Sequence, residues 1–324
     1  NISIAREALW VIILALAMVL KAGLPAIIVG RLLCSSAEGL AVLFFSRRFV
    51  KFKLHWEKFF ILQILRESWP FALTAFSSLI YIRIDQVMLY KLTDVRQLGY
   101  YAAAVRIADL PAIVPAALMT AMFPVLSQVV SKNELFERYM NIAFRCLAIV
   151  IFGLAAFITL GSPTIITLPF GKEYLASAPV LSLLIWSGVG TFFSMAIYIA
   201  LTAKGLQRII PLSTVLGAML NIFLNIFLIP KWGIMGASLA TVISYNFSGY
   251  IFLLFLPVSR SLAMKAIKTS LYPFISALAC ILILKPFPQI LSLTLSPIIF
   301  TGFLFIFGAW RISDIRLLWD SQNA

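Results

Sequence analysis

Four charged side chains lie within stretches of the sequence that are otherwise apolar. Arg83 and Asp85 interrupt the run WPFALTAFSSLIYIRIDQVMLYKL, and Arg106 and Asp109 interrupt the apolar run that follows it. A charge at the centre of a bilayer costs about 2.5–3.5 kcal/mol on insertion scales, and such residues mark transport pathways by default. Arginine could bind an anionic group, and aspartate could act as a coupling site.

The two charged pairs are expected at similar depths on adjacent antiparallel helices. At a helical rise of about 1.5 Å per residue, Arg83 and Asp85 lie about 13 and 10 Å below the outer end of their helix. Arg106 and Asp109 lie about 11 and 15 Å below the same surface by the same rise. The ion pairs Asp85–Arg106 and Arg83–Asp109 are therefore predicted. Such pairs either only fasten a helical hairpin or line a water-filled cavity for an anionic substrate or a coupling ion.

Two further pairs of polar residues have helical spacing. Arg31 and Glu38 are two turns apart, so they share one helix face and are predicted to extend the same polar system. Asn221 and Asn225 are one turn apart and also face one way. The asparagines could contact the hydroxyl groups of a sugar or form hydrogen bonds between helices, and we favour the second use.

The sequence offers little of the chemistry that enzymes use. Its one histidine is His55, and Cys34, Cys146 and Cys280 are scattered singly through apolar runs. Neither the ligand spacing of a zinc site nor a phosphate-binding glycine loop occurs, so no metal, cofactor or ATP motor is predicted. The expected outer loops are too short for a typical membrane glycosyltransferase. The sequence therefore predicts a transporter and not an enzyme.

Membrane helices must position these residues. Hydrophobic residues make up 62% of the 324 residues and charged residues 12%, and the mean hydropathy is +1.02. Apolar stretches long enough to cross a bilayer recur from end to end without the alternation of barrel strands, which predicts an all-α polytopic membrane protein of about ten helices. The expected spans are 4–22, 24–45, 69–92, 99–129, 142–160, 174–203, 209–229, 234–257, 269–286 and 289–310.

Prolines and small residues refine this prediction. The run 99–129 is longer than a bilayer is thick and contains three prolines, so a kinked helix is expected there. The segment 230–233 is expected to be a tight turn, and Gly236 and Ala240 form a pair of small residues suited to close helix packing. Prolines near the proposed ends of spans are Pro70, Pro230, Pro257, Pro273, Pro286 and Pro288.

Basic residues predict the orientation. The formal net charge is +14, with 26 lysines and arginines against 12 acidic residues. If the loop 46–68 is cytoplasmic, sixteen basic residues fall inside and six outside, which is the asymmetry of the positive-inside rule. Both termini are then cytoplasmic, and the charge signals topology and not a nucleic-acid partner. Residues 52–66 could lie flat as an interfacial helix or form an irregular loop.

Three collinear stretches carry a family resemblance. They are IRIDQVMLYKLTDVRQLGYYAAAVRI followed by FPVLSQ, FGKEYLASAPVLSLL (170–184) and LNIFLNIFLIPKWGIMGASLATVIS (220–244). They resemble the Wzx-like polysaccharide and O-antigen flippases of the multidrug/oligosaccharidyl-lipid/polysaccharide exporter superfamily. The resemblance implies a MATE-like fold of two six-helix lobes in a bacterial inner membrane. It also implies an undecaprenyl-diphosphate-linked oligosaccharide as substrate, and polysaccharide polymerase and chain-length machinery could be further partners.

The resemblance also implies a division of the chain. Residues 1–45 would be the last two helices of an N-terminal lobe and 46–68 a basic linker. Residues 69–257 would be a complete C-terminal lobe, and 258–324 two additional helices with a cytoplasmic tail. Four helices of the first lobe would be missing, so a fragment is expected, and one lobe cannot enclose a central cavity.

Two alternatives to a glycan flippase stay open. A cation-coupled multidrug exporter of the same fold should present an acidic or aromatic pocket in place of balanced arginine and aspartate pairs. A non-transporting membrane enzyme or assembly protein is the other alternative. An enzyme that works on the outer face should carry several carboxylates on an outer loop, where only Asp94 and Glu173 are expected.

Overall fold

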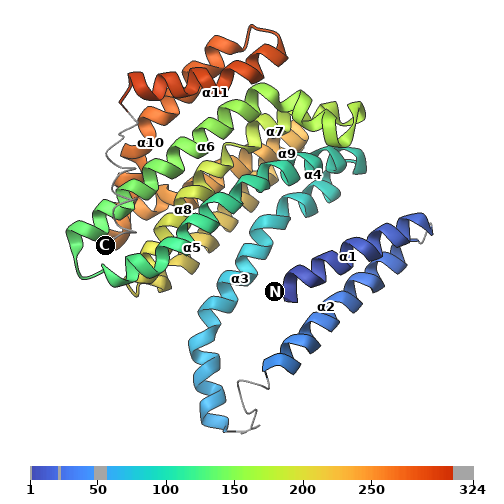
Figure 1. Cartoon of the computed structure of the whole chain (residues 1–324), viewed down its shortest axis with the longest axis vertical. Helices are drawn as coiled ribbons and strands as arrows, with labels where there is room; N and C mark the ends of the chain where they lie inside the picture. Colours follow the sequence, from blue (N-terminus) through green and yellow to red (C-terminus); the bar gives the residue numbers. More distant parts are fainter. Residues whose placement is uncertain (1, 21–22, 47–56, 309–324) are drawn as a thin grey trace. The chain divides into compact units, whose positions relative to one another are not determined.

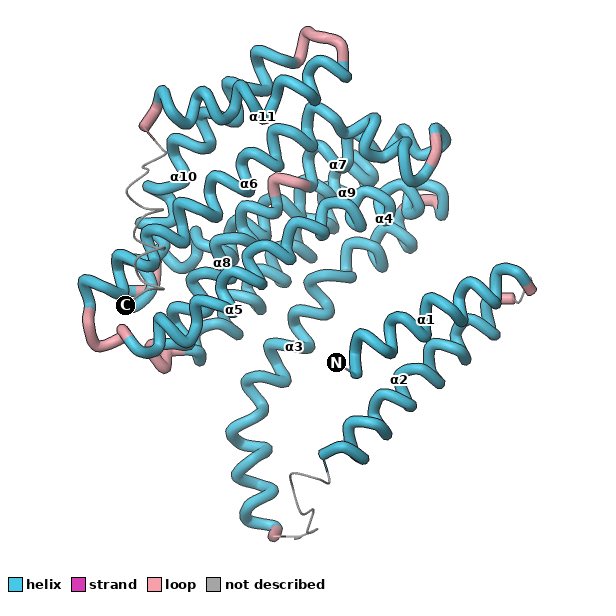
Figure 2. The backbone as a smooth tube through the Cα atoms, viewed as in Figure 1, coloured by secondary structure: helices cyan, strands magenta, loops and turns pink. Residues whose placement is uncertain are grey.

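The computed structural model describes residues 2–20, 23–46 and 57–308, which form helices joined by short turns (Figures 1 and 2). No strand occurs among these residues, so the predicted all-α class is confirmed. In chain order the elements are α1 (Ile2–Val19), α2 (Leu24–Ser46), α3 (Lys58–Leu92), α4 (Val95–Asp109), η1 (Leu110–Ala112), α5 (Ile113–Gln128), α6 (Asn133–Phe170), η2 (Lys172–Ser177), α7 (Ala178–Leu184), α8 (Ser187–Ala203), η3 (Gln207–Ile209), α9 (Ile210–Asn246), η4 (Phe247–Ile251), η5 (Phe252–Leu254), α10 (Pro257–Leu284) and α11 (Gln289–Ile306).

Most of these helices suit a bilayer. Within the described part of the chain, six helical stretches are long and apolar enough to cross a membrane. A seventh is added if the bent pair Lys172–Leu184 and Ser187–Ala203 is one span. One of the six, Gln207–Leu254, contains the span predicted at 209–229 and most of the span predicted at 234–257. The helical membrane fold is confirmed, and the total of ten spans stays a prediction.

The chain divides into two compact units, residues 1–66 and residues 67–324. In the first unit, α1 packs against α2, and Ala17 and Cys34 are buried in this pair. Most of the large apolar side chains of α1 and α2 stay exposed, as expected for helices that face lipid. The second unit holds α4 to α11 and most of α3, and it contains the main core.

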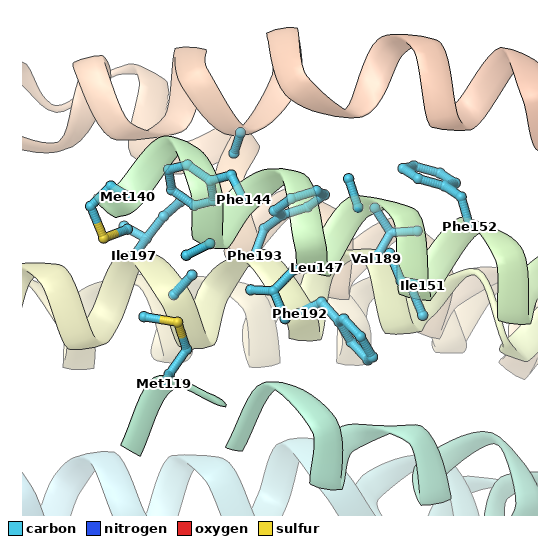
Figure 3. Close-up of a cluster of buried hydrophobic side chains, with 14 of the residues drawn as sticks. Met119, Met140, Phe144, Leu147, Ile151, Phe152, Val189, Phe192, Phe193 and Ile197 are labelled. Carbon is cyan, nitrogen blue, oxygen red and sulfur yellow. The ribbon is translucent and has the colours of Figure 1, made fainter. Parts of the chain in front are cut away.

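That core lies between α6 and its neighbours α8 and α10. Met140, Phe144, Leu147 and Ile151 fall on one face of α6, because residues three or four positions apart lie above one another on a helix. They are fully buried, and the Phe144 ring lies 6.0 Å from the ring of Phe193 on α8 (Figure 3). Lipid tails are as apolar as these side chains, so close packing is what holds the helices together.

Three helical stretches are interrupted near the charged and polar residues that the sequence singles out. A 3₁₀ turn at η1 separates α4 from α5 within the stretch Val95–Gln128, and the kink predicted for 99–129 stays a prediction. A bend of 44° separates η2 and α7 from α8. Within α9, Gly233 has φ 54° and ψ −130°, a conformation that only glycine adopts without strain, and the turn predicted at 230–233 is confirmed.

Two helix starts predicted from prolines are wrong. The helix α3 runs from Lys58 through Pro70, and α10 runs from Pro257 through Pro273. Membrane helices tolerate proline where neighbouring groups satisfy the carbonyl that it frees. Residues 58–66 are therefore helical, so the irregular-loop alternative is wrong for them. Residues 52–56 lie outside the described part of the chain.

Candidate functional site

Asp85 is the buried carboxylate at the centre of the candidate site. Only 4% of the residue is exposed, because α3 buries the face that carries Ser77, Tyr81, Asp85 and Leu89 at four-residue spacing. An uncompensated charge at such a place is costly, so hydrogen-bond donors must satisfy its oxygens.

Three neutral side chains donate hydrogen bonds to the Asp85 carboxylate. The Tyr101 hydroxyl on α4 and the Thr241 hydroxyl on α9 bind Oδ2 at 2.8 and 2.6 Å. The Asn225 amide on α9 binds Oδ1 at 2.7 Å. Asn225 and Thr241 lie on opposite sides of the break at Gly233. The carboxylate therefore joins α3, α4 and both halves of α9.

A chain of amides and hydroxyls continues from this point. Asn225 donates to Asn221 Oδ1 at 3.0 Å, and the Asn221 amide donates to Ser244 Oγ at 3.2 Å. Both asparagines are fully buried. Asn225 thus bonds to α3 and Asn221 bonds across the break in α9, and a contact of either residue with a sugar stays a prediction. Gly236 supports the same contact, because a Cβ there would come within 2.1 Å of the Leu228 carbonyl oxygen across the turn.

A second polar cluster lies one helical turn away on α3. The hydroxyls of Tyr81 and Ser248 are 3.1 Å apart, and the Tyr81 ring lies 4.5 Å from the ring of Tyr245. Ser213 donates to the Ser248 carbonyl at 2.5 Å, and Tyr198 donates to Ser213 at 3.2 Å. Together the two clusters give α3 a polar buried face within an apolar protein.

The predicted ion pairs Asp85–Arg106 and Arg83–Asp109 are not formed among the described residues. Arg83, Arg106 and Asp109 are exposed, whereas Asp85 is buried. Arg83 lies two positions from Asp85, which is about 200° around a helix of 3.6 residues per turn. The two side chains therefore point to opposite sides of α3, and the prediction from depth alone was wrong.

Arg31 and Glu38 belong to a separate charge network within the α1–α2 pair. Arg31 binds Glu7 at 3.2 Å, Glu38 binds Arg6 at 2.5 Å, and Arg6 also binds Glu7 at 2.5 Å. The Arg31 guanidinium lies 5.2 Å from the centre of the Trp10 ring. The sequence prediction missed Arg6 and Glu7 as partners of Arg31 and Glu38. Their occurrence just inside the first apolar run was the available signal.

A cavity of about 220 Å³ connects Asp85 with Asp109. The end of α4, the start of η1 and the break between α7 and α8 form its walls, and Asp85 and Thr241 face into it. Two of the described residues that line it are carboxylates, and none is basic. Its polar lining residues are Asp85, Asp109, Tyr101, Tyr245, Ser187, Thr191 and Thr241.

The oxygen atoms around Asp85 could hold a proton or a small hard cation. Oxygen ligands from carboxylates, amides and hydroxyls are those that hard cations prefer. Asn225 Oδ1 is buried with no hydrogen-bond partner among the described residues. The Thr241 hydroxyl lies within hydrogen-bond distance of both Asp85 Oδ2 and the Ala237 carbonyl, but it has only one proton to donate. No cluster of three or more histidine, cysteine, aspartate or glutamate residues suits a metal in the described ranges.

Comparisons with known proteins identify a family and two similar sequences. A family model described as polysaccharide biosynthesis protein matches residues 2–179. The chain is 29% identical over 149 residues to the "Probable low-salt glycan biosynthesis flippase Agl15" of Haloferax volcanii, which covers 45% of this chain and 32% of that protein. It is 32% identical over 97 residues to the uncharacterized membrane protein MJ1068 of Methanocaldococcus jannaschii, covering 30% and 19%.

A solved structure shares the fold. The structure titled "Lipid II flippase MurJ, inward closed conformation" matches with a TM-score of 0.73 and 19% identity, covering 93% of this chain and 65% of that one. The chain thus spans less than two thirds of each of these proteins. Because the family model matches more than half of the 324 residues, this chain belongs to the family of polysaccharide biosynthesis proteins, as its resemblance to Wzx-like flippases predicted.

Proposed function

We propose that this protein is a flippase that moves a lipid-linked glycan between the leaflets of a membrane, and that Asp85 couples this movement to a monovalent cation. The observation that carries the proposal is the buried carboxylate joined to α4 and to both halves of α9. A group that binds a proton or a cation at such a junction can favour one helix arrangement over another. Family membership and the names of the similar proteins support a flippase over an enzyme.

The proposed substrate is an undecaprenyl-diphosphate-linked oligosaccharide, such as an O-antigen repeat unit for lipopolysaccharide, in a bacterial inner membrane. Arg83 and Arg106 are exposed on the second unit, and a guanidinium matches the oxygens of a diphosphate. The cavity of about 220 Å³ is smaller than typical ligand pockets, so we assign it to coupling and not to the glycan. Arg31 and Glu38 have partners on α1, which favours a structural role for them.

A cation-coupled multidrug exporter is the second candidate. The cavity combines Asp85 and Asp109 with the rings of Tyr101, Tyr245 and Phe192, which is the acidic and aromatic lining expected for a cationic drug. The glycan flippase is favoured because the family is one of polysaccharide biosynthesis and because two of the similar proteins are named as flippases.

The test is a transport assay in proteoliposomes. The protein is reconstituted with a fluorescent lipid diphosphate that carries a short oligosaccharide, and the fraction that reaches the outer leaflet is followed with a membrane-impermeant quencher. We expect flipping that requires the diphosphate, that Asp85→Asn abolishes, and that Asp94→Asn leaves unchanged. Export of a cationic dye without flipping of the lipid would favour the multidrug exporter. Failure of both would contradict a transport function for this protein.

Experiments in cells would test the finer proposals. A strain whose surface polysaccharide depends on this protein should lose that polysaccharide with Arg83→Ala while the protein still inserts into the membrane. The swap Arg83→Asp with Asp109→Arg should not restore it, because the guanidinium would move to another helix. Crosslinking to the polysaccharide polymerase or to the chain-length machinery would identify them as partners.

A further inference from the structure

We infer that Asp109 guards the mouth of a cation-selective path that leads through the cavity to Asp85. The inference rests on the proposed role of Asp85 as the coupling site, and it adds a second carboxylate whose role is to select and deliver the cation. Asp109 is exposed, whereas Asp85 is buried, and both line the same cavity of about 220 Å³. A charge entering from the surface of the second unit therefore meets Asp109 before Asp85.

The lining gives the cavity one sign of charge. Two carboxylates line it and no described lysine or arginine does, while Arg83, next to the lining residue Ile82, interacts electrostatically with Asp109 from outside the lining. A cleft with charges of one sign and apolar walls focuses the electric field and raises the local concentration of counter-ions by about 10- to 1000-fold. Ile82, Val105 and Leu184 supply the apolar walls. The cavity should therefore concentrate cations and exclude anions.

Hydroxyl groups line the same cavity as the two carboxylates. Ser187 and Thr191 lie one turn apart on α8, and both line the cavity while partly exposed. Tyr101 and Thr241, which bind Asp85, also line it. Water or hydroxyl oxygens can replace the hydration of a proton or a sodium ion along such a route. The volume admits several water molecules, each of which occupies about 30 Å³ in the liquid.

The backbone breaks coincide with this path. Asp109, Pro111 and Ala112 line the cavity at the 3₁₀ turn η1, and Ser187 and Gly188 line it at the start of α8 after the 44° bend. Short 3₁₀ segments within long helices often mark hinges. A change at either hinge would alter the width of the cavity. Asp109 is thus placed where access to Asp85 can be opened and closed.

Thiol accessibility tests the inference without relying on transport. Cys146 is the exposed native cysteine among the described residues, while Cys34 and Cys280 are buried, so Cys146→Ser removes the reactive background. In that background, Ser187→Cys places a thiol in the wall of the cavity. Its rates of modification by an aminoethyl and by a sulfonatoethyl methanethiosulfonate are compared in membranes. Field focusing predicts that the ammonium reagent reacts about tenfold faster, after correction for intrinsic reactivity.

The role of Asp109 is tested by measuring the same ratio of modification rates in variants of the Cys146→Ser, Ser187→Cys protein. Asp109→Asn should reduce the rate ratio about threefold or more, because one of two charges is lost, and Asp109→Glu should restore it. The matched control is Asp94→Asn, which removes an exposed carboxylate at the other end of α4 and keeps a good N-cap. An unchanged ratio in Asp109→Asn, or a thiol that neither reagent modifies, would overturn the inference.

A transport measurement separates this inference from the proposed coupling role of Asp85. Flipping is measured against sodium concentration at fixed pH and against pH at fixed sodium, which identifies the cation. Asp109→Asn should raise the half-saturating cation concentration several-fold and leave the maximal rate nearly unchanged, whereas Asp85→Asn should abolish the dependence. Full transport by Asp85→Asn would refute the coupling role alone, because the thiol ratios would still report on Asp109. An unaltered half-saturating concentration in Asp109→Asn would count against the inference alone.

Discussion

At the residue scale, the polar groups around Asp85 differ in how replaceable they are. Tyr101 and Thr241 share one carboxylate oxygen, and Asn225 alone donates to the other. Removing a donor from a buried acceptor costs more than the bond contributes, because the acceptor is left without water. The loss of Asn225 should therefore be the most damaging, since no other described side chain donates to that oxygen.

Tyr101→Phe measures the cost of removing one hydrogen-bond donor from the Asp85 carboxylate, because the variant lacks a single oxygen atom. The variant keeps the ring and removes the hydroxyl that binds Asp85 at 2.8 Å, so the free energy of unfolding should fall by about 1.5–3 kcal/mol if the carboxylate is charged. Tyr100→Phe is the matched control, because the Tyr100 hydroxyl accepts only an exposed hydrogen bond from Arg96. Unfolding in mixed detergent micelles measures both variants. Equal losses would show that the buried hydroxyl has no special role.

At the element scale, glycine lets α8 lie against the end of α9 and η4. A Cβ built on Gly190 would lie 2.3 Å from the Tyr245 carbonyl oxygen, which belongs to the backbone and cannot turn away. Tyr245 lines the cavity and packs on Tyr81. The close approach of these helices thus fixes one wall of the candidate site.

Gly190→Ala should force α8 and α9 apart. We expect the free energy of unfolding to fall by about 1–3 kcal/mol, as for other overpacked interiors. Gly99→Ala is the control, because a Cβ at Gly99 would meet nothing within 4 Å and alanine favours the helix. Thermal unfolding of the two variants in one detergent gives the comparison. A Gly190→Ala protein as stable as Gly99→Ala would disprove the close contact.

The start of α4 has a cap that depends on pH. The backbone N–H of Gln97 donates to the Asp94 carboxylate at 2.7 Å, and this bond holds the pKa of Asp94 below its usual value. A lowered folded pKa means that the cap stabilises the helix above the unfolded pKa, and that this contribution is lost as the pH falls through the folded pKa. Asp94→Ala should thus weaken amide protection of Gln97 at neutral pH.

Hydrogen exchange of the Gln97 amide measures this effect. The difference between wild type and Asp94→Ala should disappear at a pH below the folded pKa of Asp94, where the wild-type carboxyl is also neutral. Asp94→Asn should keep much of the protection at neutral pH, because asparagine is also a good N-cap. Protection that does not change with pH in the wild type would contradict the cap.

At the scale of the whole molecule, the basic residues and the apolar helices define a multi-pass membrane protein. The fold matches 65% of a lipid II flippase structure, and the family model covers residues 2–179. The fold does not give the orientation of the protein in the membrane, but the distribution of basic residues predicts it through the positive-inside rule. Residues 46–68 should face the cytoplasm, and the turn at η2 should face the other side.

Cysteine labelling tests that orientation. His55→Cys, in a segment outside the described residues, should react with an impermeant maleimide only after the membrane is opened. Lys172→Cys on η2 should react in intact cells. Both changes are made in the Cys146→Ser background, which removes the exposed native thiol. The opposite pattern would invert the topology.

Much of this fold could be predicted from the sequence, but only part of the site. Asp85, Asn221 and Asn225 stand out, because carboxylates and amides are rare in apolar helices. Tyr101 and Thr241 do not, since hydroxyl groups are common there and can bind the preceding carbonyl of their own helix. The partners of Asp85 depend on the rotation of α3, which depth along the helix does not determine. The break at Gly233 was predictable from local residues, whereas the contacts across it were not.

The hydrogen-bond partners of Asp85 are synthesised at different times after Asp85 itself. Asn225 and Thr241 lie 140 and 156 residues further along the chain, and only Tyr101, at 16 residues, is made soon afterwards. At about 5–20 residues per second, a ribosome needs about 7–30 s to add 140 residues. During that interval α3 must enter the membrane with its carboxylate only partly satisfied. Nascent chains stalled before α9 should therefore be a target for membrane quality control, and Asp85→Ala should lengthen their lifetime in a pulse-chase experiment.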